Sequence, residues 1–276
     1  MIASPDIASV GSGSLVGFVL GLIGGGGSIL AVPLLVYVVG VASPHVAIGT
    51  SSVAVALSAF SNLVGHARVG NVRWPCAIVF SLAGIAGAAA GSAIGKRFDG
   101  QKLLLLFGLL MIVIAVMMLV RRKGHGTQFR PLERATAGTL LPRLLGMGGA
   151  VGGMSGFFGI GGGFLLNKVG GDPDQVVPGL MAAARMPMIT AIGSSLVAVT
   201  AFGITTAVSY ALSGLVDWHI AALFVAGGVA GGVGGTLLAH RLATHKTMLT
   251  RVFAGIVAVV GLYVVWRGYG AVVAPA

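Results

Sequence analysis

The chain has 276 residues, of which 8% are Asp, Glu, Lys or Arg and 56% are hydrophobic. An average soluble domain carries about 25% charged residues, so this composition excludes a soluble enzyme, a disordered chain and a secreted disulfide scaffold. The 17 basic residues outnumber the 6 acidic ones and give a net charge of +11. In so apolar a chain we interpret this excess as a signal of membrane orientation rather than of nucleic-acid binding.

Uncharged stretches long enough to cross a bilayer follow one another along the chain. Residues 1–14 are expected to form a short N-terminal tail, and they lack the basic start of a signal peptide. Two apolar segments, 15–39 and 144–184, are interrupted by glycine clusters. Continuous spans are predicted at residues 46–64, 75–95, 103–120, 186–215, 220–239 and 252–266. The expected fold is an all-α polytopic membrane bundle, with a C-terminal tail at 268–276.

A basic linker at residues 121–142 divides two similar halves, 15–120 and 143–267. The sequence from Ala47 to Ser51, Ala-Ile-Gly-Thr-Ser, recurs 144 positions later as Ala-Ile-Gly-Ser-Ser, ending at Ser195. The same offset relates Gly87-x-x-x-Gly91 to a second pair of glycines at 231 and 235. Small residues at this spacing are typical of close helix packing in membranes. We therefore predict a duplicated unit.

The basic residues indicate how the two halves are related. If every half crosses the membrane an even number of times, nine basic residues face seven, which is almost no bias. If each glycine-interrupted segment is a hairpin that returns to its own side, twelve share the linker's side and four oppose them. The second count fits the positive-inside rule. It predicts two inverted repeats, each a glycine-broken hairpin plus three transmembrane helices, with both termini outside and the basic stretch 121–143 in the cytoplasm.

The glycine clusters precede Val-Pro in both halves and predict broken helices at membrane depth. A helix that begins there exposes free N–H groups and a partial positive charge, which together suit an anion. Two facing breaks predict an anion site that needs no charged side chain. The open alternative is that the glycines permit packing and nearby hydroxyls bond to their own backbones. The predicted substrate-binding residues are Gly26, Gly27, Ser28, Thr50, Ser51, Asn62, Gly162, Gly163, Ser194, Ser195 and Thr206.

Three further residues are weaker candidates for binding the substrate. His66 and Tyr210 occupy equivalent positions near span ends, and Arg185 precedes Met-Pro at the entry of a helix. Each is also explained as an interfacial or capping residue.

Catalytic and cofactor motifs are missing from the sequence. It has no phosphate-binding loop and no constellation of His, Asp and Glu for metal binding or acid–base chemistry. Cys76 is the single cysteine and is expected to be buried. We therefore expect no enzyme, no metal and no cofactor.

The two motif sets resemble the TauE/SafE sulfite exporter family. They are Gly-Leu-Ile-Gly-Gly-Gly-Gly27 with Val32-Pro33 and the Thr50-Ser51 motif, and their second copies around residues 156–195. The resemblance extends from about residue 15 to 266. It implies a multi-pass permease for sulfite or organosulfonates in a bacterial-type cytoplasmic membrane. The second copy carries nine extra residues, 167–175, which we interpret as an exposed extension; a lid or a disrupted half-site are the alternatives. Deleting the extension is expected to leave transport intact.

The function predicted from these features is export of a small anion by alternating access. A channel-like pore for small anions or neutral solutes, and a non-transporting scaffold subunit, are the rival interpretations. The expected partners are the small anionic substrate and the lipid bilayer. Small-residue faces also permit a homodimer, and no nucleic acid is expected.

Overall fold

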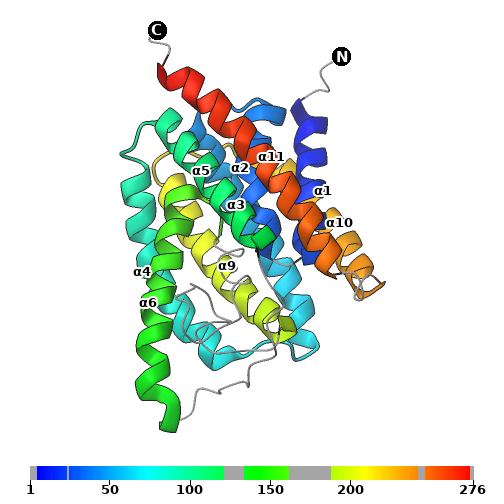
Figure 1. The fold of residues 1–276 in the computed structure, drawn as a ribbon, viewed down its shortest axis with the longest axis vertical. Coiled ribbons are helices and arrows are strands. Elements are labelled where there is room, and N and C mark those ends of the chain that lie inside the picture. Colours follow the sequence, from blue (N-terminus) through cyan, green and yellow to red (C-terminus); the bar gives the residue numbers. More distant parts are fainter. Residues whose placement is uncertain (1–4, 24, 121–133, 162–187, 242–245, 274–276) are drawn as a thin grey trace.

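The computed structural model describes residues 5–23, 25–120, 134–161, 188–241 and 246–273, and every regular element in these ranges is a helix. Seven of the described helices are long and apolar enough to cross a membrane. The six continuous spans predicted from the sequence are confirmed, and α1 adds the seventh. The elements drawn in Figure 1 are α1 (Pro5–Ile23), η1 (Gly25–Leu30), α2 (Ala31–Leu34), η2 (Leu35–Val39), α3 (Pro44–Arg68), α4 (Trp74–Gly95), α5 (Gly100–Val120), α6 (Arg134–Phe158), α9 (Met188–Ala211), α10 (Trp218–Arg241) and α11 (Lys246–Val273).

Several helices extend beyond the boundaries predicted from hydropathy. Helix α1 begins at Pro5, so residues 5–14 are helical rather than a tail. Ser9 and Ser12 lower the hydropathy of this stretch, yet both are buried, and the Ser9 hydroxyl donates to the carbonyl of Pro5 at 2.6 Å. Helix α6 likewise begins inside the predicted linker, and α11 continues to Val273. Residues 121–133 of the linker lie outside the described residues.

The first glycine cluster turns the chain back on itself. Helix α1 runs away from the end of the molecule that carries the termini, and η1, α2 and η2 return toward that end before α3 begins (Figure 1). Gly27 permits the close return, because a Cβ there would lie 2.6 Å from the Leu20 nitrogen and 2.8 Å from the Val16 carbonyl oxygen. Gly40, with φ of 87°, then ends η2.

Each of the main helix pairs joins a helix of the first half to a helix of the second half. Helix α1 packs along α10, and its counterpart α6 packs along α4, while α3 packs on α9 and α5 on α11. The contacts are equivalent in detail: Gly17 meets the carbonyl of Gly228, and Gly152 meets that of Gly84. A side chain at any of these glycines would collide with the partner's backbone. The predicted close-packing faces are thereby confirmed, since Gly87, Gly91, Gly231 and Gly235 each face a backbone carbonyl of the other half.

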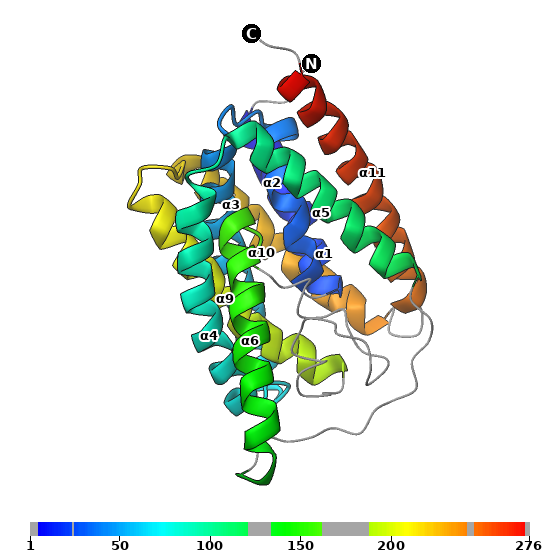
Figure 2. The ribbon, with the colours of Figure 1, turned by 60° about the vertical axis from the view of Figure 1, so that its left-hand side comes forward.

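Corresponding helices run in opposite directions. Helices α1 and α3 run away from the end where both termini lie, whereas α6 and α9 run toward it (Figures 1 and 2). Helix α5 ends, and α6 begins, at the opposite end of the molecule.

The central helices and the peripheral ones differ in burial. The inner face of α3 is buried through Ala47, Thr50, Ala54 and Ala59, whereas α5 and α11 lie side by side at the edge (Figure 2). Their outward apolar side chains, such as Val116 and Val259, are more than half exposed, as expected of a surface that faces lipid.

Candidate functional site

The second glycine break ends α6 and reaches the centre of the bundle. Gly159 and Gly161 both adopt positive φ, 68° and 65°, which glycine tolerates and other residues disfavour. A Cβ on Gly161 would lie 2.8 Å from a Val55 methyl and 2.9 Å from a Val199 methyl. Val55 and Val199 are 144 positions apart, so the break is held between equivalent residues of α3 and α9.

The Gly159→Ala variant is expected to be destabilised by about 2–4 kcal/mol. Positive φ alone costs roughly 1–2 kcal/mol for a residue with a Cβ, and the new atom would lie 2.5 Å from the Ile48 side chain. Gly214→Ala is the matched control, because its φ is 69° and no atom of the described residues lies within 4 Å of the added atom. Thermal unfolding in detergent measures both variants. Equal losses would contradict a packing role for Gly159.

Two hydroxyls of the first half meet the break of the second half. Ser51 and Ser52 donate to the carbonyl of Ile48 at 2.9 and 2.7 Å. Each hydroxyl also lies 3.4 Å from the carbonyl oxygen of Gly159. The stronger bonds remain within α3, which favours the alternative that these hydroxyls satisfy their own backbone.

The next pair of predicted site residues forms hydrogen bonds that cross between the halves. The Thr50 hydroxyl oxygen accepts from the backbone N–H of Asp217 at 3.0 Å, and the Ser194 hydroxyl oxygen accepts from that of Arg73 at 2.9 Å. Ser194 follows Thr50 by 144 positions, and Asp217 follows Arg73 by the same number, so the two bonds are equivalent in the repeat. We call these two bonds the crossed hydroxyl bonds.

The crossed hydroxyl bonds lie near opposite ends of the bundle. Thr50 is near the start of α3 and Ser194 near the start of α9, and these helices run in opposite directions (Figure 1). The helices pass each other where Gly203 faces Ala56. A rise of about 1.5 Å per residue then separates the two hydroxyls by roughly 20 Å along the bundle. One small ligand therefore does not touch both.

The remaining predicted polar residues are mostly bonded within their own helices. The Asn62 amide donates to the carbonyl of Ser58 at 3.1 Å, and the Thr206 hydroxyl donates to that of Phe202 at 2.9 Å. Ser28 and Ser195 are fully buried, and His66 is half-buried near the end of α3.

Tyr210 differs from these residues. Its side chain is fully buried, yet its hydroxyl has no hydrogen-bond partner among the described residues. It lies beside the end of α6: a Cβ on Gly95 would be 2.9 Å from the Phe157 carbonyl oxygen and 3.3 Å from this hydroxyl. An unsatisfied buried hydroxyl costs about 1–3 kcal/mol.

A lysine that the sequence analysis did not select for binding lies next to Tyr210. The Lys96 ammonium donates to the Ser209 carbonyl and to the Ser213 hydroxyl, both at 2.9 Å, and lies 5.8 Å from the centroid of the Tyr210 ring. The only sequence signal for Lys96 is that it is a basic residue directly after a predicted span.

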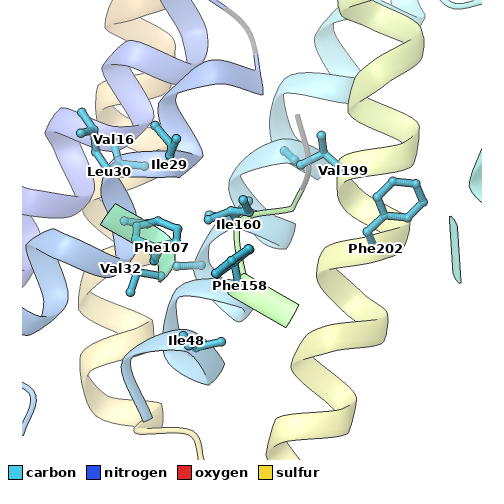
Figure 3. Close-up of a cluster of buried hydrophobic side chains, with 14 of the residues drawn as sticks. Val16, Ile29, Leu30, Val32, Ile48, Phe107, Phe158, Ile160, Val199 and Phe202 are labelled. Atoms are coloured by element: carbon cyan, nitrogen blue, oxygen red, sulfur yellow. The ribbon is translucent and has the colours of Figure 1, made fainter. Parts of the chain in front are cut away.

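Buried apolar side chains pack together between the described parts of the two breaks. Ile29 of η1, Ile160 of the second break and Val199 of α9 are fully buried in one cluster (Figure 3). Of the predicted binding residues, Tyr210 belongs to the same buried cluster. The cavities of about 580 and 400 Å³ are lined by other residues.

Part of the predicted site lies outside the described residues, namely Gly162, Gly163, Arg185 and the extension 167–175. For Gly26, the backbone belongs to η1. Within the part of the chain that the structure describes, no three His, Cys, Asp or Glu side chains form a group able to hold a metal ion. Cys76 is buried, as predicted.

Comparison with known proteins covers almost the entire chain. The family model for the sulfite exporter TauE/SafE matches residues 9–264. A "probable membrane transporter protein" of Xylella fastidiosa strain Temecula1 is 51% identical over 268 residues, which are 97% of this chain and 98% of that protein. The "probable membrane transporter protein YunE" of Bacillus subtilis is 26% identical over 279 residues, covering 93% and 96% of the two chains. No solved structure matches significantly.

Proposed function

Because the chain belongs to the TauE/SafE sulfite exporter family, we propose that it exports small sulfur-containing anions, of the sulfite or organosulfonate type, by alternating access. The family and the named relatives make it a membrane transporter. The substrate class rests on the family description together with the backbone donors expected at two glycine breaks.

The proposed mechanism rests on one observation: each half packs against the other through equivalent contacts. Helices α1 and α10 pack through the same kind of glycine contacts as α6 and α4, and the corresponding helices run in opposite directions. This arrangement supports two inverted repeats around a central site, which is a common design of secondary transporters. Such a pair has two equivalent conformations in which the roles of the halves are interchanged.

The crossed hydroxyl bonds suit the two ends of an alternating-access cycle. Opening the end that carries the termini requires the start of α3 to leave the loop before α10, which breaks the bond from Asp217 to Thr50. Opening the opposite end breaks the bond from Arg73 to Ser194. Both bonds are formed in the present conformation, and the apolar cluster between the breaks is buried. A sealed centre favours a transporter over an open pore.

We assign the anion site to the second glycine break and its surroundings. Its proposed donors are the Tyr210 hydroxyl and the Lys96 ammonium, because the Gly159 N–H already donates to the Ser155 carbonyl. Donors fixed in a low-dielectric environment bind anions more strongly than the same donors in water. The first break, with Gly26, Gly27 and Ser28, is the equivalent site on the other half.

The orientation of the protein follows from its charges and helix directions. Helices α3 and α5 end on the side opposite the termini, α3 with Arg68, and the basic stretch 121–143 follows α5 in the sequence. We therefore place that end in the cytoplasm and the termini outside, in a bacterial-type cytoplasmic membrane. The small anionic substrate and the bilayer are its proposed partners, and a homodimer remains part of the proposal.

Binding of a panel of anions to purified protein tests the proposed substrate. Sulfite, thiosulfate, taurine and sulfoacetate are expected to raise the unfolding temperature in a saturable manner, whereas chloride is not. Tyr210→Phe is expected to weaken the response about tenfold, because it removes a hydrogen bond to a charged ligand. Thr200→Val is the control, since within the described part of the chain the Thr200 hydroxyl bonds to the Leu196 carbonyl of its own helix. Indifference to every sulfur oxyanion would overturn the substrate class.

Flux into liposomes separates the transporter from its alternatives. Saturable uptake of the anion that stabilises the protein is expected. Sustained ion conductance in planar bilayers would instead support a pore, and the absence of any flux would support a scaffold subunit.

A further inference from the structure

A cavity unconnected with the predicted binding residues lies at the end of the molecule that carries the termini. It has a volume of about 580 Å³ and is lined by η2 with the turn after it, the start of α5 and the end of α11. Three polar side chains from these three elements line it: Tyr37, Gln101 and Arg267. None of the residues assigned to the anion site takes part.

The polar groups of the cavity have the chemistry of a phosphate site. Arg267 offers a planar fork of N–H donors that matches the oxygens of a phosphate, and Tyr37 and Gln101 add a hydroxyl and an amide. Among the described residues no carboxylate lines the cavity, so the guanidinium keeps its charge available for an anion. The sequence around Arg267 contains no acidic residue within α11 either.

The surroundings of the cavity distinguish a lipid from a free anion. Trp266, which lines the cavity, is 71% exposed, and Tyr263 and Tyr269 on the same helix are 44% and 63% exposed. The Tyr37 ring packs edge-on against Tyr263, with 5.2 Å between the ring centroids. Exposed Trp and Tyr near a helix end are typical of the headgroup level of a bilayer. The cavity therefore combines a charged end with an aromatic, lipid-facing side.

We propose that this cavity binds the phosphate of an anionic phospholipid, with Arg267 as its principal ligand. The acyl chains extend along the outward faces of η2 and α11, where Val38 and Leu262 are more than half exposed. Bound lipid joins the hairpin of the first half to α5 and α11. The site stands independently of the proposed transport function, since it uses none of the residues assigned to transport.

Native mass spectrometry of the purified full-length chain tests the proposal with three probes: phosphatidylglycerol, phosphatidylcholine and inorganic phosphate. Wild-type protein is expected to retain phosphatidylglycerol in preference to phosphatidylcholine. Arg267→Gln is expected to lose that preference by about tenfold, since each basic group near a membrane surface strengthens anionic-lipid binding and the fork adds directed hydrogen bonds. Arg251→Gln, a charge at the other end of α11, serves as the matched control and is expected to keep the preference.

A second variant separates loss of the site from loss of the fold. Arg267→Lys retains the charge without the planar fork and is expected to bind with intermediate affinity. Its unfolding temperature in lipid-free detergent is expected to equal that of the wild type. The proposal is overturned if phosphatidylcholine binds equally well, if Arg251→Gln has the same effect as Arg267→Gln, or if inorganic phosphate displaces the lipid at equal concentration.

Discussion

Gly17→Ala is expected to prevent stable packing of α1 on α10, whereas Gly11→Ala in the same helix is expected to be tolerated. A Cβ on Gly17 would collide with the carbonyl of Gly228, and both atoms belong to backbones that cannot rotate away. No described residue has an atom within 4 Å of a Cβ on Gly11. Overpacking of this kind costs about 1–3 kcal/mol or more, while alanine in an open helical position gains up to about 1 kcal/mol over glycine.

The second half offers an equivalent pair of variants for the same experiment. Gly152→Ala would collide with the carbonyl of Gly84, whereas Gly146→Ala meets no atom of the described chain within 4 Å. Thermal unfolding in detergent and the yield of monodisperse protein measure all four variants. We expect the two clashing variants to lose stability in parallel and the two open variants to retain it. Unequal losses at Gly17 and Gly152 would contradict equivalent packing in the two halves.

These glycines also show how far sequence alone reaches. The spacing of Gly87-x-x-x-Gly91 predicts close packing, and the structure confirms it. The partner of that face is not encoded in local spacing, because α4 packs on a helix more than fifty residues away. Hydropathy predicts a start of α1 that is too late in the sequence, because Ser9 and Ser12 are polar. Small buried hydroxyls nevertheless suit a close helix pair as well as apolar residues do.

The offset between equivalent residues of the two halves changes along the chain, as the contacts in the structure show. Gly17 corresponds to Gly152 by their equivalent contacts, an offset of 135, whereas Thr50 corresponds to Ser194 at an offset of 144. The difference of nine residues equals the length of the extension 167–175. Equivalent contacts therefore recur before and after this segment, at offsets that differ by its length.

The predicted hydroxyls illustrate the limit of motif reasoning. Thr50 and Ser51 adjoin in sequence, yet Thr50 accepts a hydrogen bond from a loop of the other half while Ser51 lies at the second glycine break. Ser194 occupies the equivalent position near the opposite end. A motif identifies which residues are repeated, but helix direction decides which of them meet, and Tyr210 acquires its buried hydroxyl only through tertiary packing.

Thr50→Val and Ser194→Ala are expected to bias the transporter toward opposite open states. Each variant removes the acceptor of one crossed hydroxyl bond and leaves a backbone N–H without that partner. A lost hydrogen bond of about 1 kcal/mol changes a two-state equilibrium roughly fivefold. Thr50→Val favours opening at the end with the termini, and Ser194→Ala favours opening at the other end, so transport is expected to slow in both.

Cysteine labelling from each side of the membrane distinguishes the two biases. In a background in which Cys76 is replaced by alanine, Ile48→Cys reports on the end with the termini and Ile192→Cys, at the equivalent position, on the other. We expect Thr50→Val to raise labelling of the first reporter and Ser194→Ala that of the second, each about fivefold. Thr200→Val, whose buried hydroxyl bonds within its own helix, is expected to change neither. The repeat relates the two bonds, so two halves that exchange roles must respond in opposite directions. If both variants raise labelling of the same reporter, alternating exchange is contradicted and the crossed hydroxyl bonds are purely structural contacts.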